Sequence, residues 1–178
     1  RSGLQPKRCT APDPREMDAM ESVEAQRIIA LAQELDTRAD LGLRDLIDFL
    51  EHLELSPDDV AALRRPDPEH PYGRRVLMAT PNVEVMVATW TRGVTCAPHD
   101  HGGQYGAVKV LEGRSRHRIY KLGHDGLAIA REHTVDPDGI IRCGPDVIHA
   151  MGDDAADDQL VTLHLYTRSI PHMVVYDT

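Results

Sequence analysis

The stretch Gly93-Val-Thr-Cys-Ala-Pro-His99-Asp-His101-Gly-Gly-Gln-Tyr-Gly106-Ala-Val-Lys-Val-Leu-Glu-Gly113 decides the fold of this chain. Side chains alternate along an extended strand, so His99 and His101 point to the same side. The proline before this pair and the two glycines after it predict a strand that enters a tight bend. A second strand follows from Gly106 and is closed by a turn at Gly113. Two imidazoles that converge in this way can bind one divalent metal ion.

The spacing of this stretch resembles the first cupin motif, G-x5-H-x-H-x4-E-x6-G, at every fixed position except one. Gly106 stands where most cupins carry a metal-binding glutamate. About 50 residues downstream, Gly144-Pro-Asp-Val-Ile-His149 resembles the second cupin motif, in which one histidine completes the metal shell from the opposite sheet. The resemblance implies His99, His101 and His149 as the metal ligands. Neutral imidazole alone leaves Fe(II), Zn(II), Cu(II) and Ni(II) open.

The glycine at position 106 bears on the chemistry of this metal site. Three protein nitrogens on one face would leave adjacent positions open for a substrate and O2. Three neutral ligands also leave Fe(II) more positive than a carboxylate ligand would. That charge favours an anionic ligand such as a thiolate, because coordination deprotonates a thiol.

A second constellation lies on the last predicted strand, Val161-Thr-Leu-His-Leu-Tyr166. Thr162, His164 and Tyr166 alternate with apolar residues, so the period of two places all three polar groups on one face. A hydroxyl, an imidazole and a phenol in a row can form a hydrogen-bonded relay. Such a relay could orient the Tyr166 hydroxyl toward the metal.

Taken together, the chain resembles the cysteine dioxygenase family of thiol dioxygenases, which are cupins with a three-histidine iron. Four separated pieces match in order: Tyr72-Gly-Arg74, Pro98-His-Asp-His101, Ile148-His149 and Thr162-Leu-His-Leu-Tyr166. The resemblance implies one Fe(II) per chain and a relay of Thr162, His164 and Tyr166 beside it. It also implies that Arg74 pairs with a substrate carboxylate, for which the planar fork of arginine is suited, and we expect Tyr72 of the same motif to bind the substrate as well.

The sequence departs from this family at two places. Animal members carry a cysteine that forms a thioether with the tyrosine, and Gly106 occupies that position, so we expect Tyr166 to be unmodified. After the tyrosine the family usually reads Ser-Pro-Pro, whereas this chain has Thr167-Arg168-Ser169. Arg168 is therefore a second candidate for binding the substrate carboxylate, and Met173 is a candidate pocket residue.

Composition excludes several classes of protein. With 178 residues, 41% of them hydrophobic and 28% charged, the chain suits one globular domain. A formal charge of -9 argues against nucleic acid as a partner. No apolar run approaches the ~18 residues that span a bilayer. Three cysteines at unrelated spacings make a disulfide framework unexpected, and we expect a cytoplasmic monomer.

The chain changes character along its length. Residues 1–14 are polar and aperiodic and predict a flexible arm, whereas residues 15–66 have helical periodicity and predict a layer that packs on the main domain. Apolar stripes predict a first helix through Val23, Ile28, Ile29, Leu31 and Leu35 and a second from Leu43 to Leu53. Residues 71–177 hold short strands between turns, which predicts a mainly β jelly-roll barrel with the metal site. The remaining histidines, His117 and His133 among them, are expected at the surface.

The sequence therefore predicts an Fe(II)-dependent thiol dioxygenase that oxidises a small carboxylate-bearing thiol with O2 to its sulfinic acid. Cysteine is the family's default substrate, and 3-mercaptopropionate or ergothioneine stay open because of the Thr-Arg-Ser segment. A cupin isomerase or a ring-cleaving dioxygenase would use the same metal face without requiring the relay. A non-catalytic cupin that binds a metal or a small molecule is the alternative from another class.

Overall fold

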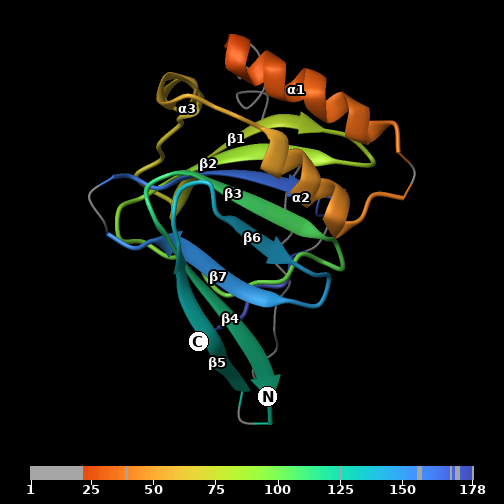
Figure 1. The fold of residues 1–178 in the computed structure, drawn as a ribbon. Helices are drawn as coiled ribbons and strands as arrows, with labels where there is room; N and C mark the ends of the chain where they lie inside the picture. The colour runs from red at the N-terminus through yellow and green to blue at the C-terminus, as the bar shows by residue number, and fades with distance from the viewer. Residues whose placement is uncertain are drawn as a thin grey trace.

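The computed structural model of this chain describes residues 22–38, 40–124, 126–155, 158–168, 170 and 173–177. Within these residues, three helices precede eight strands (Figure 1). The helices are α1 (Val23–Asp36), α2 (Leu43–His52) and α3 (Pro57–Leu63). The strands are β1 (Tyr72–Ala79), β2 (Glu84–Trp90), β3 (Gly106–Glu112), β4 (Ser115–Gly123), β5 (Gly126–Val135), β6 (Ile140–Cys143), β7 (Ile148–Asp153) and β8 (Val161–Tyr166). None of the described helices is both long and apolar enough to cross a membrane.

The helices begin where the sequence offers caps. The Ser22 hydroxyl accepts a hydrogen bond from the Ala25 amide at 3.1 Å and starts α1. At α3, Ser56 and Asp59 form a reciprocal capping box, and proline occupies the first turn. The apolar stripe of α1 differs in part from the expected one, because Val23 and Leu31 are exposed. The buried side is made by Ala25, Ile28, Ala32 and Leu35.

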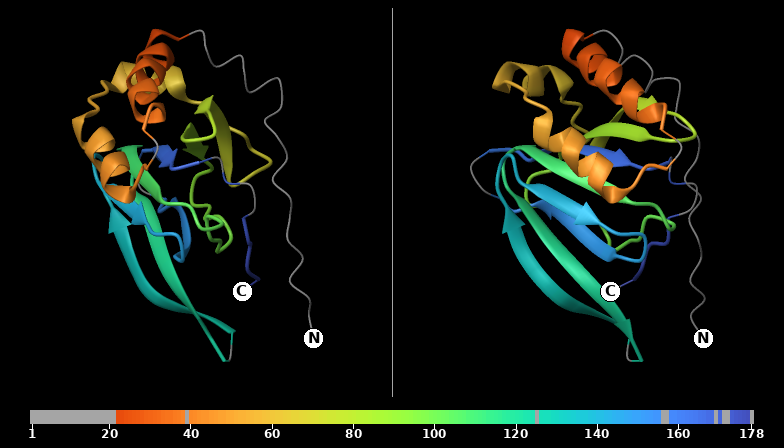
Figure 2. Two further views of the ribbon diagram at one scale, coloured as in Figure 1. Left: turned by 90° about the vertical axis from the view of Figure 1, so that its right-hand side faces the viewer. Right: turned by 45° about the vertical axis from the view of Figure 1, so that its right-hand side comes forward.

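The strands form two antiparallel sheets, one with the order β1-β2-β8-β3-β6 and one with the order β5-β4-β7. The three helices cover the outer face of the five-stranded sheet, and the three-stranded sheet lies on its other side (Figure 1). Lys109 of β3 links the five-stranded sheet to α2, because its buried ammonium donates to the carbonyls of Leu50 and Leu53 at 3.2 and 2.7 Å. These carbonyls lie at the C-terminal end of α2, where a cation is favourable. The β4–β5 hairpin projects well beyond the rest of the molecule (Figure 2).

The five-stranded sheet separates two apolar cores, and this explains the alternation along β8. Leu163 and Leu165 belong to the core beneath the helices. Tyr166 belongs to the second core, which lies between the two sheets with Trp90 and Met151. The predicted period of two is therefore correct, because the polar members of β8 face the space between the sheets.

The mainly β architecture with a helical N-terminal layer is confirmed, with two local differences. The segment around His99 is not a regular strand but extended chain with isolated bridges, from Thr95 to Gly152 and from His99 to His149 and Val175. The strand β7 was not expected as such, although it carries His149. The predicted flexible arm, residues 1–14, lies outside the described residues, and the predicted domain boundaries stay predictions.

Candidate metal centre

Three histidines converge between the sheets. His149 lies on β7, and His99 and His101 lie on the extended segment that runs beside it. One nitrogen from each of the three rings lies within 4.8 Å of the others. The Nε2 atoms of His101 and His149 are 3.1 Å apart, so these two nitrogens face each other. His101 and His149 are buried and His99 is half-buried, which leaves one side of the group accessible.

Backbone contacts fix the segment that carries the first two histidines. His99 and His149 exchange both of their backbone hydrogen bonds, at 2.8 and 2.9 Å. Further along the same segment, Gly152 passes so close to Val94 that a Cβ on the glycine would lie 2.2 Å from the Val94 carbonyl oxygen. Glycine at 152 is therefore required for the close approach. The ladder holds His99 opposite His149 through main-chain contacts.

The protonation state of these rings suits a metal. Burial lowers the pKa of His101 to about 3 and holds the pKa of His149 well below its usual value. Burial also lowers the pKa of His99. Neutral imidazoles are the form that binds metal, so the site need not release protons from the rings. Three neutral nitrogens fit Fe(II), and equally Zn(II) or Cu(II).

His117 of β4 adds a contact that sequence reasoning missed. It was expected at the surface, yet it is 2% exposed, and its Nε2 lies 2.9 Å from Nδ1 of His149. The Cys143 sulfur is also near His149 Nδ1, at 3.7 Å, and His117, Cys143 and His149 form a second close cluster. No spacing along the chain signals this contact, because it arises from the register between β4 and β7.

Gly106 lies where the relay meets the metal ligands. A Cβ at this position would lie 3.0 Å from the Tyr166 ring and 3.2 Å from Nδ1 of His101. The rings of His101 and Tyr166 pack edge to face, with centroids 5.1 Å apart. A larger residue at 106 would have to displace one of these two rings.

The relay on β8 is formed, and its hydrogen bonds have a direction. Thr162 Oγ1 lies 2.7 Å from His164 Nε2, and His164 Nδ1 lies 2.9 Å from the Tyr166 hydroxyl. The indole of Trp90 donates to the Thr162 oxygen at 2.9 Å. Among the described residues, the buried Thr162 hydroxyl then has one acceptor for its own hydrogen, Nε2 of His164. His164 must therefore carry its proton on Nδ1 and donate to the Tyr166 oxygen.

This direction leaves the Tyr166 O–H hydrogen free to point elsewhere. Burial lowers the pKa of His164 to about 3, so the imidazole is neutral as the relay requires. Burial also holds the pKa of Tyr166 well above its usual value, so the phenol keeps its proton. Tyr166 is thus a hydrogen-bond donor, and sequence reasoning did not identify Trp90 as the group that sets the direction.

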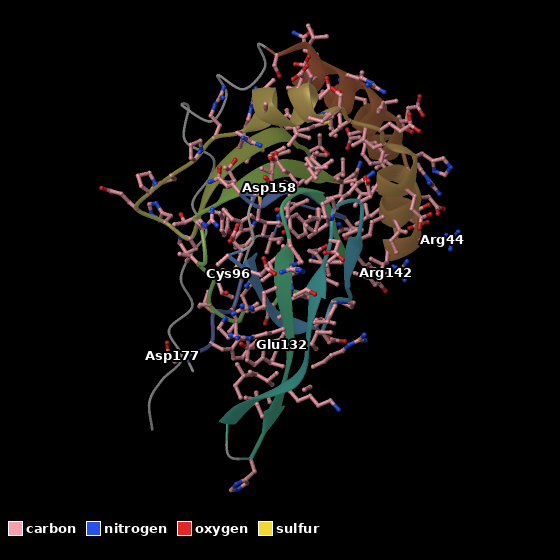
Figure 3. The ribbon with its side chains drawn as sticks, turned by 60° about the vertical axis from the view of Figure 1, so that its left-hand side comes forward. Arg44, Cys96, Glu132, Arg142, Asp158 and Asp177 are labelled. Carbon is pink, nitrogen blue, oxygen red and sulfur yellow. The ribbon has the colours of Figure 1, made fainter. Side chains whose placement is uncertain are left out.

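A cavity of about 100 Å³ joins the relay to the histidines. Its lining includes the two metal-site histidines His99 and His149, the relay residues His164 and Tyr166, and also Tyr72, Arg74 and Met173. A wider outer pocket of about 420 Å³ shares Tyr72, Arg74, Cys96, His99 and Met173 with it. Cys96 is one of the residues at which the two spaces meet, and Figure 3 shows it on the other side of the picture from Arg44 of α2.

The charged wall of this cavity holds a pair that the sequence did not predict. Arg74 of β1 donates to the carboxylate of Glu84 on β2 at 2.5 Å, and its Nε donates to the Met86 sulfur at 3.1 Å. Glu84 is 6% exposed and lines the cavity. The wall therefore carries one positive and one negative charge side by side.

Arg168 does not line the cavity beside His99 and His149. It is exposed and lines a separate polar pocket with Arg38, Asn82 and Tyr105. Ser169, its neighbour in the departure from the family pattern, lies outside the described residues. Of the two arginines considered for carboxylate binding, only Arg74 lines the cavity of the histidines.

Comparison with solved structures supports the fold. A conserved protein with a double-stranded β-helix domain from Klebsiella pneumoniae superposes with a TM-score of 0.53 and 16% identity, covering 67% of this chain and 95% of that one. The protein TT1209 from Thermus thermophilus superposes with a TM-score of 0.51 and 17% identity, covering 65% of this chain and 99% of that one. Peruvianin-I, a cysteine peptidase from Thevetia peruviana latex, superposes with a TM-score of 0.51 and 10% identity, covering 65% of this chain and 74% of that one. These likenesses support a double-stranded β-helix fold and leave the chemistry open.

The family is decided by a match over almost the whole chain. The model of the family described as cysteine dioxygenase type I matches residues 16–178. The match includes the helical layer as well as the barrel, so it extends beyond the shared cupin fold. This chain belongs to the cysteine dioxygenase type I family.

Proposed function

We propose that this protein is an Fe(II)-dependent thiol dioxygenase that oxidises a small carboxylate-bearing thiol to its sulfinic acid. The reaction adds both atoms of O2 to the sulfur, so RSH and O2 give RSO2H with no other reactant. The observation that carries the proposal is the convergence of His99, His149, Arg74 and the Tyr166 hydroxyl on one small cavity. Family membership supports a dioxygenase, and the three neutral imidazoles support a metal.

One Fe(II) per chain would be held by His99, His101 and His149. The chemistry that iron supplies when bound is deprotonation of the thiol and activation of O2. The residues around it would do the rest. Burial of the cavity excludes bulk water and strengthens each electrostatic contact inside it.

Arg74 and Tyr72 would bind the carboxylate end of the substrate. A guanidinium binds a carboxylate with two parallel hydrogen bonds, which fixes orientation as well as position. Glu84 already engages Arg74, so a bound carboxylate shares this guanidinium with it. The cavity volume of about 100 Å³ favours a small thiol, and the wider outer pocket gives room for a longer one only toward the mouth. Met173 would form part of the apolar wall.

Tyr166 would donate its O–H hydrogen bond to the reacting end of the substrate. Thr162 and His164 would hold the phenol in place through the directed relay, and neither would need to change its protonation state. A donor fixed before the reaction stabilises negative charge as it develops, without reorganisation. A cupin that only binds a small molecule does not need a directed donor of this kind, so the relay favours catalysis.

Two further aspects belong to the proposal. Cys96 and Cys143 are free thiols, which supports a reducing compartment such as the cytoplasm. A monomer as the functional unit is part of the same proposal.

Oxygen uptake by the iron-loaded protein tests this function. A panel of cysteine, 3-mercaptopropionate, ergothioneine and cysteamine should give thiol-dependent uptake with at least one carboxylate-bearing member and little with cysteamine. Oxygen uptake with a catechol would favour the ring-cleaving alternative. No oxygen uptake with any thiol, while the metal is bound, would favour the non-catalytic alternative.

A further inference from the structure

His117 is buried inside the barrel wall, next to a proposed metal ligand. It lies on β4, is 2% exposed, and places Nε2 at 2.9 Å from Nδ1 of His149. The two rings meet nearly perpendicular, at 76° with centroids 5.1 Å apart. This distance is that of a hydrogen bond between two imidazoles, so one nitrogen must carry a proton and the other must not.

The geometry of His149 decides which nitrogen that is. Its Nε2 faces Nε2 of His101 at 3.1 Å, so Nε2 is the atom turned toward the other ligands. A metal ligand needs a lone pair on that nitrogen, and a neutral imidazole then carries its proton on Nδ1. His149 must therefore donate from Nδ1, and Nε2 of His117 must accept. The remaining proton of His117 belongs on Nδ1.

The three ligands are not held alike. His99 is fixed by the backbone, because its Nδ1 lies 2.9 Å from the Ala97 carbonyl oxygen, which only accepts. Within the described part of the chain, Nδ1 of His101 has no hydrogen-bond partner. His149 is the one of the three whose Nδ1 contacts the imidazole of a residue outside the set. An imidazole acceptor is effective in one tautomer only, so this contact holds two rings in defined states at once.

His133 closes the outer side of this contact. It lies opposite His117 on β5, and the two rings pack edge to face with centroids 5.1 Å apart. Nδ1 of His117 has no hydrogen-bond partner among the described residues. Among the described residues, the contact with His149 is therefore the one hydrogen bond of the His117 ring, and packing against His133 helps to hold that ring in place.

We propose that His117 is a positioning residue for the metal: it fixes the tautomer and the orientation of His149 and thereby raises metal affinity. The inference rests on the metal site of the proposed function but not on its thiol chemistry. Cys143 is the other neighbour of His149 Nδ1, at 3.7 Å, but sulfur is a weak acceptor. Cys143→Ala is therefore the matched control, since it removes a buried neighbour of the same atom without removing its acceptor.

Metal affinity separates positioning from packing. His117→Phe keeps a flat ring without an acceptor, and His117→Gln restores an acceptor oxygen. Competition between each apoprotein and a chelator for Co(II) should give about 10- to 100-fold weaker binding for His117→Phe. His117→Gln should recover most of the loss, and Cys143→Ala should stay within about threefold of wild type. Equal affinity in wild type and His117→Phe, or equal loss in the Phe and Gln variants, would overturn the proposal.

A second measurement requires no variant. In the Zn(II)-loaded wild type labelled with nitrogen-15, long-range proton–nitrogen correlation reports the tautomer of each imidazole. Both His117 and His149 should carry their protons on Nδ1. A proton on Nε2 of His117 would contradict the inference even if the protein oxidises thiols. The wild-type tautomers and the weaker metal binding of His117→Phe would support the positioning role of His117 even if the protein shows no thiol-dependent oxygen uptake. The missing uptake would then refute the proposed function alone.

Discussion

His99 and His149 exchange two backbone hydrogen bonds between neighbouring segments, at 2.8 and 2.9 Å, although about 50 residues separate them along the chain. The pair places two of the three proposed ligands opposite each other through main-chain contacts alone. Side-chain substitutions at either position leave these bonds intact. The metal ligands can therefore be tested by substitution without removing the ladder that positions them.

Loss of any one ligand should empty the metal site. The purified protein should hold about one iron per chain, and His99→Ala, His101→Ala or His149→Ala should each lose it, because two imidazoles are too few to retain the ion. Elemental analysis after gel filtration measures this. His52→Ala, on α2 outside the cavity, is the control. An iron content in His149→Ala equal to that of wild type would mean that the third ligand is another residue.

Removal of the Tyr166 hydroxyl should impair turnover and spare the metal. Tyr166→Phe keeps the ring that packs against His101, so iron content should be unchanged. Turnover should fall by ~10- to 1,000-fold, because a fixed donor toward developing charge is lost. Intact-mass measurement of the wild type should also show no loss of two hydrogens, since glycine at 106 provides no sulfur for a crosslink. Unchanged kinetics in Tyr166→Phe would make the relay a purely structural feature.

Arg74 should determine recognition of the substrate carboxylate. Arg74→Ala should weaken the binding of a carboxylate-bearing thiol by about 2–4 kcal/mol and leave the binding of cysteamine nearly unchanged. Trp90 lines the cavity and is the only tryptophan of the chain, so quenching of its fluorescence under anaerobic conditions measures binding without turnover. Arg168→Ala, in the separate pocket, is the control. A large loss in Arg168→Ala with none in Arg74→Ala would place the substrate in a different pose.

Glu84 allows the same site to be tested in the opposite direction. In the proposed complex, Glu84 would share Arg74 with the carboxylate of the substrate. Glu84→Gln should therefore tighten the binding of 3-mercaptopropionate, which carries no charge besides its carboxylate and its thiolate. Glu112→Gln breaks a comparable pair with Arg64 outside the cavity and should have no effect on binding. Weaker binding of 3-mercaptopropionate to Glu84→Gln would show that Glu84 holds Arg74 in its binding orientation rather than competing for it.

The buried imidazole of His164 should make the folded protein sensitive to acid. Its pKa falls from 6.5 to about 3, so between these values the unfolded chain binds a proton that the folded chain does not. The contribution of His164 to stability is thus complete above pH 6.5 and decreases as the pH falls, by up to about 1.4 kcal/mol per pH unit. Urea unfolding of the metal-free wild type and His164→Gln between pH ~7 and ~5 should show the steeper loss in wild type. Parallel curves would contradict the shift.

Local rules were enough to predict some of the site from the sequence and not the rest. The positions of Thr162, His164 and Tyr166 follow from the period of a strand, and the placement of His99 beside His149 followed from a motif resemblance. His117 and Glu84 could not be predicted in this way. The first depends on the register between β4 and β7, and the second on the pairing of β1 with β2.

Arg168 is a residue that the sequence proposed for the site and that the structure places at another pocket. It stands two residues after Tyr166, where the family usually has proline, and this departure suggested a place in the pocket. The chain leaves the sheet after β8, however, and Arg168 lies at a separate polar pocket. Trp90 was missed because an apolar strand residue gives no sign that its indole sets the direction of a relay on the neighbouring strand.

The central claim, that both atoms of O2 are added to a thiol sulfur, is tested most directly with isotopically heavy oxygen. The iron-loaded protein is supplied with heavy O2 in ordinary water and the most active carboxylate-bearing thiol, and the product is weighed by mass spectrometry. The account predicts a sulfinic acid in which both oxygens are heavy and one O2 is consumed per thiol. A disulfide product, or a sulfinic acid with oxygen from water, would contradict it.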